Sequence, residues 1–420
     1  MEPTAAAAPP ATGRVGRPRP LVVGALGIGQ ILAWGSTFYL LTVLSAPITA
    51  DTGWPTTLVV GGVSAALLCA AAVSPAVGTL ISRGRGRAVL IASAAVLAAG
   101  LAALSAATTP GLYLAAWTVL GIGMGAGLYS PAFSFLGQLY GGSARSAITA
   151  LTLYGGFAST LCWPLSAWLV EHIGWRGTCL AYAAAHVAVA LPLYAAALPR
   201  HAPPQAPTPK TPWASAGSGP GPGMPTVVLV AAVATISTTV STAMSVHMLT
   251  LFQAFGLTAT AAVLLAAAIG PSQVAARVVE LLAGGRHHPL WTLFAAVSAI
   301  AVATTAMGAT ATVSLVLVVC YGAGIGLASI GNGTAPLAVF GREHYARVMG
   351  RIAVPALLAQ AAAPLWGSVL IDHLGERRML LVLGGMAGAA ILMVLTLLHT
   401  ERARRRYRSG PSTTRRRDVP

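Results

Sequence analysis

Charged residues are scarce in this chain. Of its 420 residues, 8% are Asp, Glu, Lys or Arg, whereas about 25% is usual for a soluble domain. Apolar residues make up 56% of the chain, and the mean hydropathy is +0.75. This composition excludes an ordinary water-soluble fold and indicates a protein that resides in a lipid bilayer.

Acidic residues and cysteines are also few. The nine Asp and Glu residues fall mostly in loops and tails, so they do not supply the convergent acid–base or metal-binding cluster that a membrane enzyme needs. We therefore expect the protein not to be an enzyme and to use no cofactor and no metal. The four cysteines lie in or near apolar stretches at unrelated spacings, which predicts packed free thiols without disulfides.

Long apolar runs are abundant. Only residues 1–20, the Pro/Gly/Ser-rich residues 199–225 and the Arg-rich residues 400–420 are unsuited to cross hydrocarbon. A spanning helix needs about 20 apolar residues, so the remaining length accommodates about twelve spans with short turns. The runs are continuous instead of alternating, which favours helices over strands. The predicted spans are 21–46, 56–81, 87–108, 112–139, 145–171, 175–198, 226–254, 258–283, 289–308, 311–340, 347–371 and 378–399.

Basic residues gather on one predicted side of the membrane. Of the 25 Lys and Arg residues, all but Arg176, Arg277, Arg377 and Arg378 fall in the termini or in loops that alternate onto the same side. The positive-inside rule places that side and both termini in the cytoplasm, which requires an even number of spans. The net charge of +16 follows from this topology and needs no nucleic-acid partner.

The two ends of the chain carry further information. The first apolar run is too long for the core of a signal peptide and follows an arginine-bearing start, so we expect it to remain as a span. For the arginines between Arg402 and Arg417, contact with anionic lipid head groups and a role as a topology anchor both remain open. The preference for Arg over Lys, with much Ala and Gly, is typical of a GC-rich bacterial genome.

Two pairs of segments about 200 residues apart resemble each other. GIGMGAGLYSP within 121–145 matches GIGLASIGNGT within 324–347, and WPLSAWLVEHIGWR (163–176) matches APLWGSVLIDHLGERR (363–378). Repeats at half the length of a twelve-span chain predict two six-span halves that insert in the same orientation. The predicted parts are an N-terminal tail (1–20), a first half (21–198), a linker (199–225), a second half (226–399) and a basic tail (400–420).

This organisation resembles that of the major facilitator superfamily of secondary transporters over roughly residues 21–399. The loop after the second span, GTLISRGRGR (78–87), is similar to the gating-loop motif of that family. Ser82 stands where the family has an aspartate, which removes the charge that latches the cytoplasmic side in that motif, and a serine there is expected to cap a short helix. The matching positions are Gly78, Leu80, Arg83 and Arg87.

The resemblance implies a monomer in the cell membrane that moves a small organic solute by alternating access about a site near the bilayer midplane. Trp117 stands in the fourth span where many proton-coupled relatives have an arginine. The fifth span, GGFASTLCWP (155–164), lacks the glycine-proline motif of drug antiporters. Drug export therefore has less weight than solute transport, but it stays open, as does a membrane sensor that transports nothing.

Arg277 is the leading candidate for substrate binding. It is predicted two or three turns inside the cytoplasmic end of the eighth span, with Gln273 one turn deeper and Glu280 nearly one turn shallower. An arginine there can hold a carboxylate or phosphate through paired hydrogen bonds, and monocarboxylate and oxalate-type members of the superfamily carry an arginine in this span. The alternatives are a structural Arg277–Glu280 pair or a side chain that reaches the cytoplasmic surface.

Other polar and aromatic residues inside predicted spans are candidate lining of the same cavity, because a polar group facing hydrocarbon costs several kcal/mol unless it is satisfied. Packing between helices is the alternative for each of them. If a proton is coupled to transport, His247 and Glu280 are the candidates to carry it, since the first half has no acid well inside a span. The lining candidates are Gln30, Trp34, Phe38, Tyr129, Tyr154, Thr238, Thr242, Asn332 and Gln360.

Overall fold

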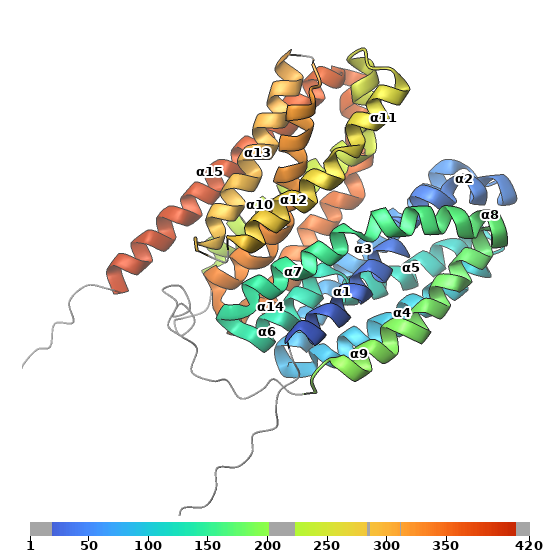
Figure 1. Ribbon diagram of the computed structural model, residues 1–420, viewed down its shortest axis with the longest axis horizontal. Helices are drawn as coiled ribbons and strands as arrows, with labels where there is room; N and C mark the ends of the chain where they lie inside the picture. Colours follow the sequence, from blue (N-terminus) through green and yellow to red (C-terminus); the bar gives the residue numbers. More distant parts are fainter. Residues whose placement is uncertain (1–18, 201–222, 284–285, 311, 409–420) are drawn as a thin grey trace, which may run out of the picture.

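Residues 19–200, 223–283, 286–310 and 312–408 are described in a computed structural model of the chain (Figure 1). Every regular element in these residues is a helix, and eight helical stretches are long and apolar enough to cross a membrane. The prediction of an all-helical membrane protein is therefore confirmed. The predicted tails and the linker 199–225 lie largely outside the described residues.

The helices of the first half follow the predicted apolar runs but divide three of them. A turn at residues 36–39 divides the predicted span 21–46, and breaks at Leu128 and Phe157 divide the spans 112–139 and 145–171. The helix after Phe157 continues across the predicted boundary into the span 175–198. The elements are α1 (Arg19–Gly35), α2 (Leu40–Thr52), α3 (Thr56–Leu80), η1 (Ile81–Arg85), α4 (Gly86–Ser105), α5 (Pro110–Gly127), α6 (Tyr129–Tyr140), η2 (Gly141–Ser143), α7 (Ala144–Gly156), α8 (Ala158–Ala185), η3 (His186–Ala190) and α9 (Leu191–Ala197).

The second half begins with a long helix whose end coincides with that of the predicted span 226–254. Its fifth helix continues through a turn that the sequence predicts as a loop, so that two predicted spans form one long element. The elements are α10 (Met224–Ala254), α11 (Ala259–Ala267), α12 (Ile269–Leu282), α13 (Pro289–Thr310), α14 (Leu315–Leu374) and α15 (Glu376–Arg408).

Glycines in the left-handed conformation turn the chain at corresponding places in the two halves. Their φ angles lie between 54° and 88°, a region that costs energy for any residue with a Cβ atom. The glycines of each pair are separated by about 200 residues, which is also the spacing of the sequence repeat. The turns therefore recur together with the repeated motifs. The pairs are Gly53 and Gly256, Gly141 and Gly341, and Gly174 and Gly375.

The repeated glycine-rich motifs allow close helix packing. A Cβ atom at Gly121 of α5 would lie 2.8 Å from the Cα atom of Ala66 on α3. At Gly326 of α14 it would lie 2.9 Å from the Cα atom of Gln273 on α12. Real Cβ atoms essentially never approach a neighbour this closely, so only glycine lets these backbones touch. Both motifs therefore place a helix directly against its neighbour within one half.

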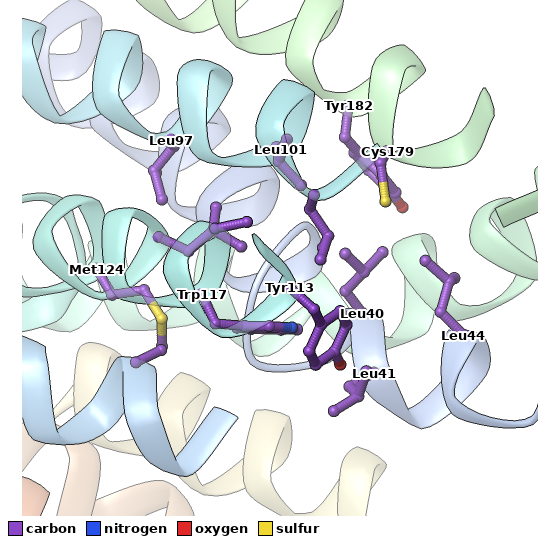
Figure 2. Close-up of a cluster of buried hydrophobic side chains, with 14 of the residues drawn as sticks. Leu40, Leu41, Leu44, Leu97, Leu101, Tyr113, Trp117, Met124, Cys179 and Tyr182 are labelled. Carbon is purple, nitrogen blue, oxygen red and sulfur yellow. The ribbon is translucent and has the colours of Figure 1, made fainter. Parts of the chain in front are cut away.

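Aromatic and aliphatic side chains fill the core of the first half (Figure 2). Trp117 and Tyr113 are fully buried there, and the Tyr113 hydroxyl donates to the Val59 carbonyl over 2.7 Å. Trp117, which stands where many proton-coupled relatives have an arginine, is thus a packing residue. All four cysteines are free, and Cys179 packs in the same cluster.

Arginines gather at one end of the helical bundle, which we call the basic face and define by Arg19, Arg87, Arg145 and Arg402. Arg19 donates to the Ser143 carbonyl over 2.6 Å, which ties α1 to the turn before α7. Arg402 of α15 lies 5.6 Å from the ring centroid of Trp291 on α13. Ends of helices far apart in sequence therefore meet at this face.

At the opposite face of the bundle, the same type of hydrogen bond, from an arginine to a backbone carbonyl, occurs once in each half. Arg176 donates to the Ala107 carbonyl over 3.2 Å, and Arg377 donates to the Gly308 carbonyl over 2.9 Å. Arg176 also forms an ion pair with Asp51. In each half, an arginine just after a left-handed glycine therefore binds the carboxyl end of an earlier helix, where the helix dipole favours a positive charge.

The two halves touch mainly toward the basic face. A Cβ atom at Gly78 of α3 would lie 3.1 Å from the Cα atom of Gly350 on α14, and the ring of Tyr345 on α14 covers Gly137 of α6. In Figure 1 the halves meet where α6, α7 and α14 lie and diverge toward α2 and α11. The bundle is therefore joined at one end and spread at the other.

Candidate functional site

Arg277 is a buried cation with an incomplete set of partners. It lies on α12, and only 5% of the residue is exposed. Its Nε atom donates to the Ser329 hydroxyl of α14, and its Nη2 atom donates to Gln273 Oε1, both over 3.2 Å. Nη1 is buried and has no hydrogen-bond partner among the described residues. A buried donor without a partner costs about 1–3 kcal/mol, so an anionic ligand at Nη1 would remove an existing cost.

The free end of this guanidinium points into the first half. A Cβ atom added at Gly156 on α7 would collide with Nη1, so the glycine makes room for the arginine. At the preceding residue, Gly155, an added Cβ atom would meet the hydroxyl of Tyr129. Arg277 therefore lies where the two halves face each other, with Tyr129 of the first half beside it.

The polar and aromatic stripe predicted on the first span forms one connected group. Gln30 is fully buried, donates to the Gly127 carbonyl over 2.7 Å and accepts from the indole of Trp34 over 3.2 Å. The Trp34 ring then contacts the rings of Phe38 and Tyr129, with centroid distances of 5.7 and 5.2 Å. Gln30 thereby holds the indole in place, and the indole presents a flat surface toward Tyr129.

Tyr154, another predicted lining residue, lies elsewhere. It is 37% exposed, and its ring packs over Gly27 of α1. Residues two positions apart on a helix point in directions about 200° apart. Because Gly156 faces Arg277, the side chain of Tyr154 points away from it.

The polar lining predicted in the second half is not joined to Arg277. Thr238 and Thr242 lie on α10, and Asn332 and Gln360 lie on α14. Thr242 is buried and the other three are half-buried. No hydrogen bond or ring contact of the described residues connects any of them with Arg277, and their part in a cavity stays a prediction.

His247, one of the two proton-coupling candidates, packs α10 against α14. Its Nε2 atom lies 3.1 Å from the Pro364 carbonyl, and a Cβ atom at Gly367 would lie 2.6 Å from the same nitrogen. The ring thus occupies a space that glycine leaves open. This is a helix-packing contact within the second half and lies apart from the aromatic stripe.

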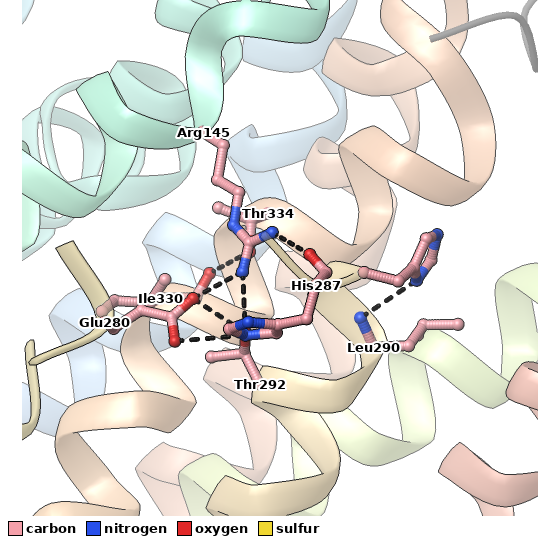
Figure 3. Close-up of polar contacts among 8 residues, drawn as sticks. Arg145, Glu280, His287, Leu290, Thr292, Ile330 and Thr334 are labelled. Carbon is pink, nitrogen blue, oxygen red and sulfur yellow. Dashed lines mark hydrogen bonds and ion pairs between the residues drawn. The ribbon is translucent and has the colours of Figure 1, made fainter. Parts of the chain in front are cut away.

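Glu280, the second candidate, pairs with an arginine of the other half (Figure 3). Arg145 Nη2 donates to Glu280 Oε1 over 2.6 Å, with the two side chains 10% and 6% exposed. The Thr292 hydroxyl donates to the same oxygen over 2.9 Å, and His287 Nε2 lies 3.3 Å from Oε2. Arg145 also donates to the His287 carbonyl and to the Thr292 hydroxyl. We call Arg145, Glu280, His287 and Thr292 the inter-half cluster.

The alternative of an Arg277–Glu280 pair is therefore wrong. Glu280 uses its carboxylate for the inter-half cluster, and Arg277 uses its donors for Gln273 and Ser329. Sequence reasoning considered only neighbours on the same helix, whereas the partner lies 135 positions away on α7. The sequence feature that pointed to Arg145 as a partner was the Ala-Arg ending shared by the two glycine-rich segments, at Arg145 and Arg347.

The predicted gating loop is built without a charge at Ser82. Gly78 lets α3 approach α14, and Arg87 donates to the carbonyls of Ala195 and Leu198 at the end of α9, over 2.8 and 3.1 Å. Arg83 is exposed.

The expectation that Ser82 caps a helix is wrong. Its hydroxyl donates back to the Thr79 carbonyl over 2.7 Å, because the chain continues as a helical turn through η1 and leaves that carbonyl within reach. The charged contact between the halves is supplied instead by the inter-half cluster. Within the described residues, no group of three or more His, Cys, Asp or Glu side chains could hold a metal ion.

Comparison with known proteins places this geometry in a family. The family described as the Major Facilitator Superfamily matches residues 26–353, and no curated protein matches the sequence. The human organic anion transporter MFSD10 (TETRAN) is similar in structure, with a TM-score of 0.72, 15% identity, and coverage of 90% of this chain and 99% of that one.

Two sugar transporters are also similar. The proton:xylose symporter XylE has a TM-score of 0.70, 13% identity, and coverage of 90% of this chain and 95% of its own. The E. coli fucose:proton symporter FucP has a TM-score of 0.69, 13% identity, and coverage of 90% and 98%. At these identities the likeness shows the fold alone, while the family match extends over most of the sequence. The chain belongs to the Major Facilitator Superfamily and is a multi-pass membrane protein with the fold of a secondary transporter.

Proposed function

We propose that this transporter carries a small organic anion, a carboxylate, across the cell membrane. The observation that supports the proposal is Arg277, a buried guanidinium with one donor group free at the contact of the two halves. Arginine binds carboxylates through paired, charge-assisted hydrogen bonds, which are about twice as strong as neutral ones. The similar human structure is described as an organic anion transporter, which agrees with this choice.

We further propose twelve spans with both termini in the cytoplasm and a monomeric carrier. The long continuous helical stretches contain glycines with positive φ at Gly84, Gly141, Gly174 and Gly341, and dividing the eight stretches at these four positions supports twelve segments. The concentration of arginine on the basic face supports its assignment to the cytoplasm. Because the halves touch mainly toward the basic face, this arrangement corresponds to a state open toward the outside, and rocking of the halves would open the cytoplasmic side.

Proton coupling is the natural extension, since the similar structures XylE and FucP are described as proton symporters. Of the two candidates, Glu280 is better placed than His247, because its ion pair joins the halves whereas His247 packs within one half. A proton on Glu280 would weaken the inter-half cluster and favour opening of the basic face. Uniport, without a coupled proton, is the alternative.

A thermal-shift series on the purified protein tests the substrate class. We expect carboxylates to raise the melting temperature of the wild type but not of Arg277→Gln, while sugars and cationic drugs have no effect on either. Arg83→Gln is the matched control, because Arg83 is an exposed arginine on η1 and has no contact with Arg277 among the described residues. Stabilisation by cationic drugs alone, unchanged in Arg277→Gln, would refute the anion proposal and favour drug export.

Transport itself is tested in proteoliposomes loaded with buffer and supplied with a labelled carboxylate. Uptake that needs Arg277 supports a carrier. Stabilisation by a carboxylate without uptake in either direction would instead indicate a sensor that binds the anion and moves nothing.

A further inference from the structure

Aromatic rings continue from Arg277 to a hollow between α2 and α8. Tyr129 and Trp34 lie at the start, with centroids 5.2 Å apart, and the Trp34 and Tyr39 centroids are 6.0 Å apart. Tyr39 then meets Trp163 of α8, edge to face, at 5.8 Å. Added Cβ atoms at the adjacent residues Gly155 and Gly156 would meet the Tyr129 hydroxyl and Arg277 Nη1, respectively, so this aromatic row begins beside the guanidinium, and Trp163 is its fourth ring.

The hollow at the far end of the row is an open depression whose volume is comparable to that of a small-molecule site. Its volume is about 500 Å³, within the range of about 300–1,000 Å³ that such sites occupy. It is lined by uncharged side chains of α2 and α8, four of them apolar and three carrying a hydroxyl: Val43, Trp163, Pro164 and Ala167, and Thr42, Ser159 and Thr160. Trp163 is 42% exposed, so one face of its indole is available for contact. In Figure 1, α7 and the first part of α8 run along the edge of the first half that faces the second half.

Arg277 and the hollow together limit the ligand to a narrower class than carboxylates in general. Arg277 offers one positive charge with a free donor, whereas none of the residues that line the hollow is charged. A second carboxylate would find no cation in the hollow, and a sugar would find three hydroxyl groups but no charged or amide side chain there. An apolar ring instead gains burial and ring stacking.

We infer that the transported anion is a monocarboxylate with an aromatic body, whose carboxylate binds Arg277 while its ring lies along the aromatic row toward Trp163. This inference rests on the proposed function and extends it from anions in general to arene carboxylates. In such an anion, the chain of atoms that joins the carboxylate to the ring would pass Trp34 and Tyr39, beside the turn between α1 and α2. Short anions such as butyrate reach the guanidinium but leave the row uncovered.

Isothermal titration of the purified full chain with paired probes tests the inference. 4-Phenylbutyrate should bind at least tenfold more tightly than butyrate, since burial of a ring of this size contributes about 1.5–3 kcal/mol, or about tenfold to a hundredfold. Trp163→Ala should weaken 4-phenylbutyrate about tenfold and leave butyrate unchanged, and Trp163→Phe should restore most of the loss. Trp168→Ala, an exposed tryptophan on the same helix outside the hollow lining, is the control and should change neither.

The outcomes separate this inference from the proposed function. Equal binding of 4-phenylbutyrate and butyrate, both lost in Arg277→Gln, would overturn the aromatic inference and leave anion transport standing. Binding of the neutral 4-phenylbutan-1-ol as tightly as 4-phenylbutyrate, unaffected by Arg277→Gln, would overturn both and show that the hollow takes apolar compounds or lipid chains. A melting curve for each variant verifies that it is folded before titration.

Discussion

The inter-half cluster leads to the sharpest prediction, which concerns the substitution Glu280→Gln. Glu280 and Arg145 come from different halves, and both side chains are at least nine-tenths buried. Glutamine keeps the shape of the side chain but leaves the positive charge of Arg145 without a counter-charge. The contact exists only while the basic face is closed. Its loss therefore destabilises the closed state and leaves the free energy of the open state unchanged.

The magnitude follows from the burial of the pair. Removing one partner of a buried ion pair costs about 3–5 kcal/mol, because the remaining charge stays desolvated. The hydroxyl of Thr292 and the carbonyl of His287 still bind Arg145, so we expect the lower end of that range. About 3 kcal/mol corresponds to a shift of about 150-fold in the equilibrium between closed and open basic faces.

Spin labels on the basic face measure this shift. Cysteines at Ala88 of α4 and Arg347 of α14, both exposed, place one label on each half in a background without the native cysteines. Glu280→Gln should move the distance distribution toward a longer, open population. Glu343→Gln, an exposed acid on α14, should leave it unchanged. The exchange of the two charges, Arg145→Glu with Glu280→Arg, should restore part of the closed population.

An unchanged distance distribution and an unchanged melting temperature in Glu280→Gln would refute the reasoning. That result would show that the Arg145–Glu280 contact contributes nothing to the joining of the halves, in spite of its burial.

Three further substitutions test the packing described above. Gly350→Ala should destabilise the closed basic face by about 1–3 kcal/mol, because its Cβ would meet the backbone of Ser74, and the same spin labels should report opening. Gly156→Ala should displace the guanidinium of Arg277 and weaken carboxylate binding about tenfold with little change in melting temperature, as titration would show; unaltered binding would mean that Nη1 does not face the ligand. Arg377→Gln should lower stability by about 1 kcal/mol in thermal unfolding, since the carbonyl of Gly308 loses a charged donor, and no change would show that water replaces the arginine without cost.

Much of the architecture was encoded locally and could be predicted from the sequence. Apolar runs of spanning length predict helices because unpaired backbone groups are too costly in hydrocarbon, and α10 accordingly ends where its predicted span ends. The glycine-rich repeats predict two halves of similar build, and close helix contacts occur within both repeated motifs, at Gly121 and Gly326. The sequence also predicted that Arg277 needs a partner or a function, since a charge inside an apolar run is costly, and the arginine is buried with Gln273 and Ser329 as partners.

Tertiary structure alone decided which residues meet. Whether Glu280 pairs with Arg277 on its own helix or with Arg145 on α7 depends on how two halves pack, and no local pattern reports contacts across 135 positions. The same holds for Trp163, whose place at the end of the aromatic row arises because α8 lies beside α2. Helix formation depends on interactions within a few residues, whereas the partners of a buried charge depend on the assembly of the whole bundle.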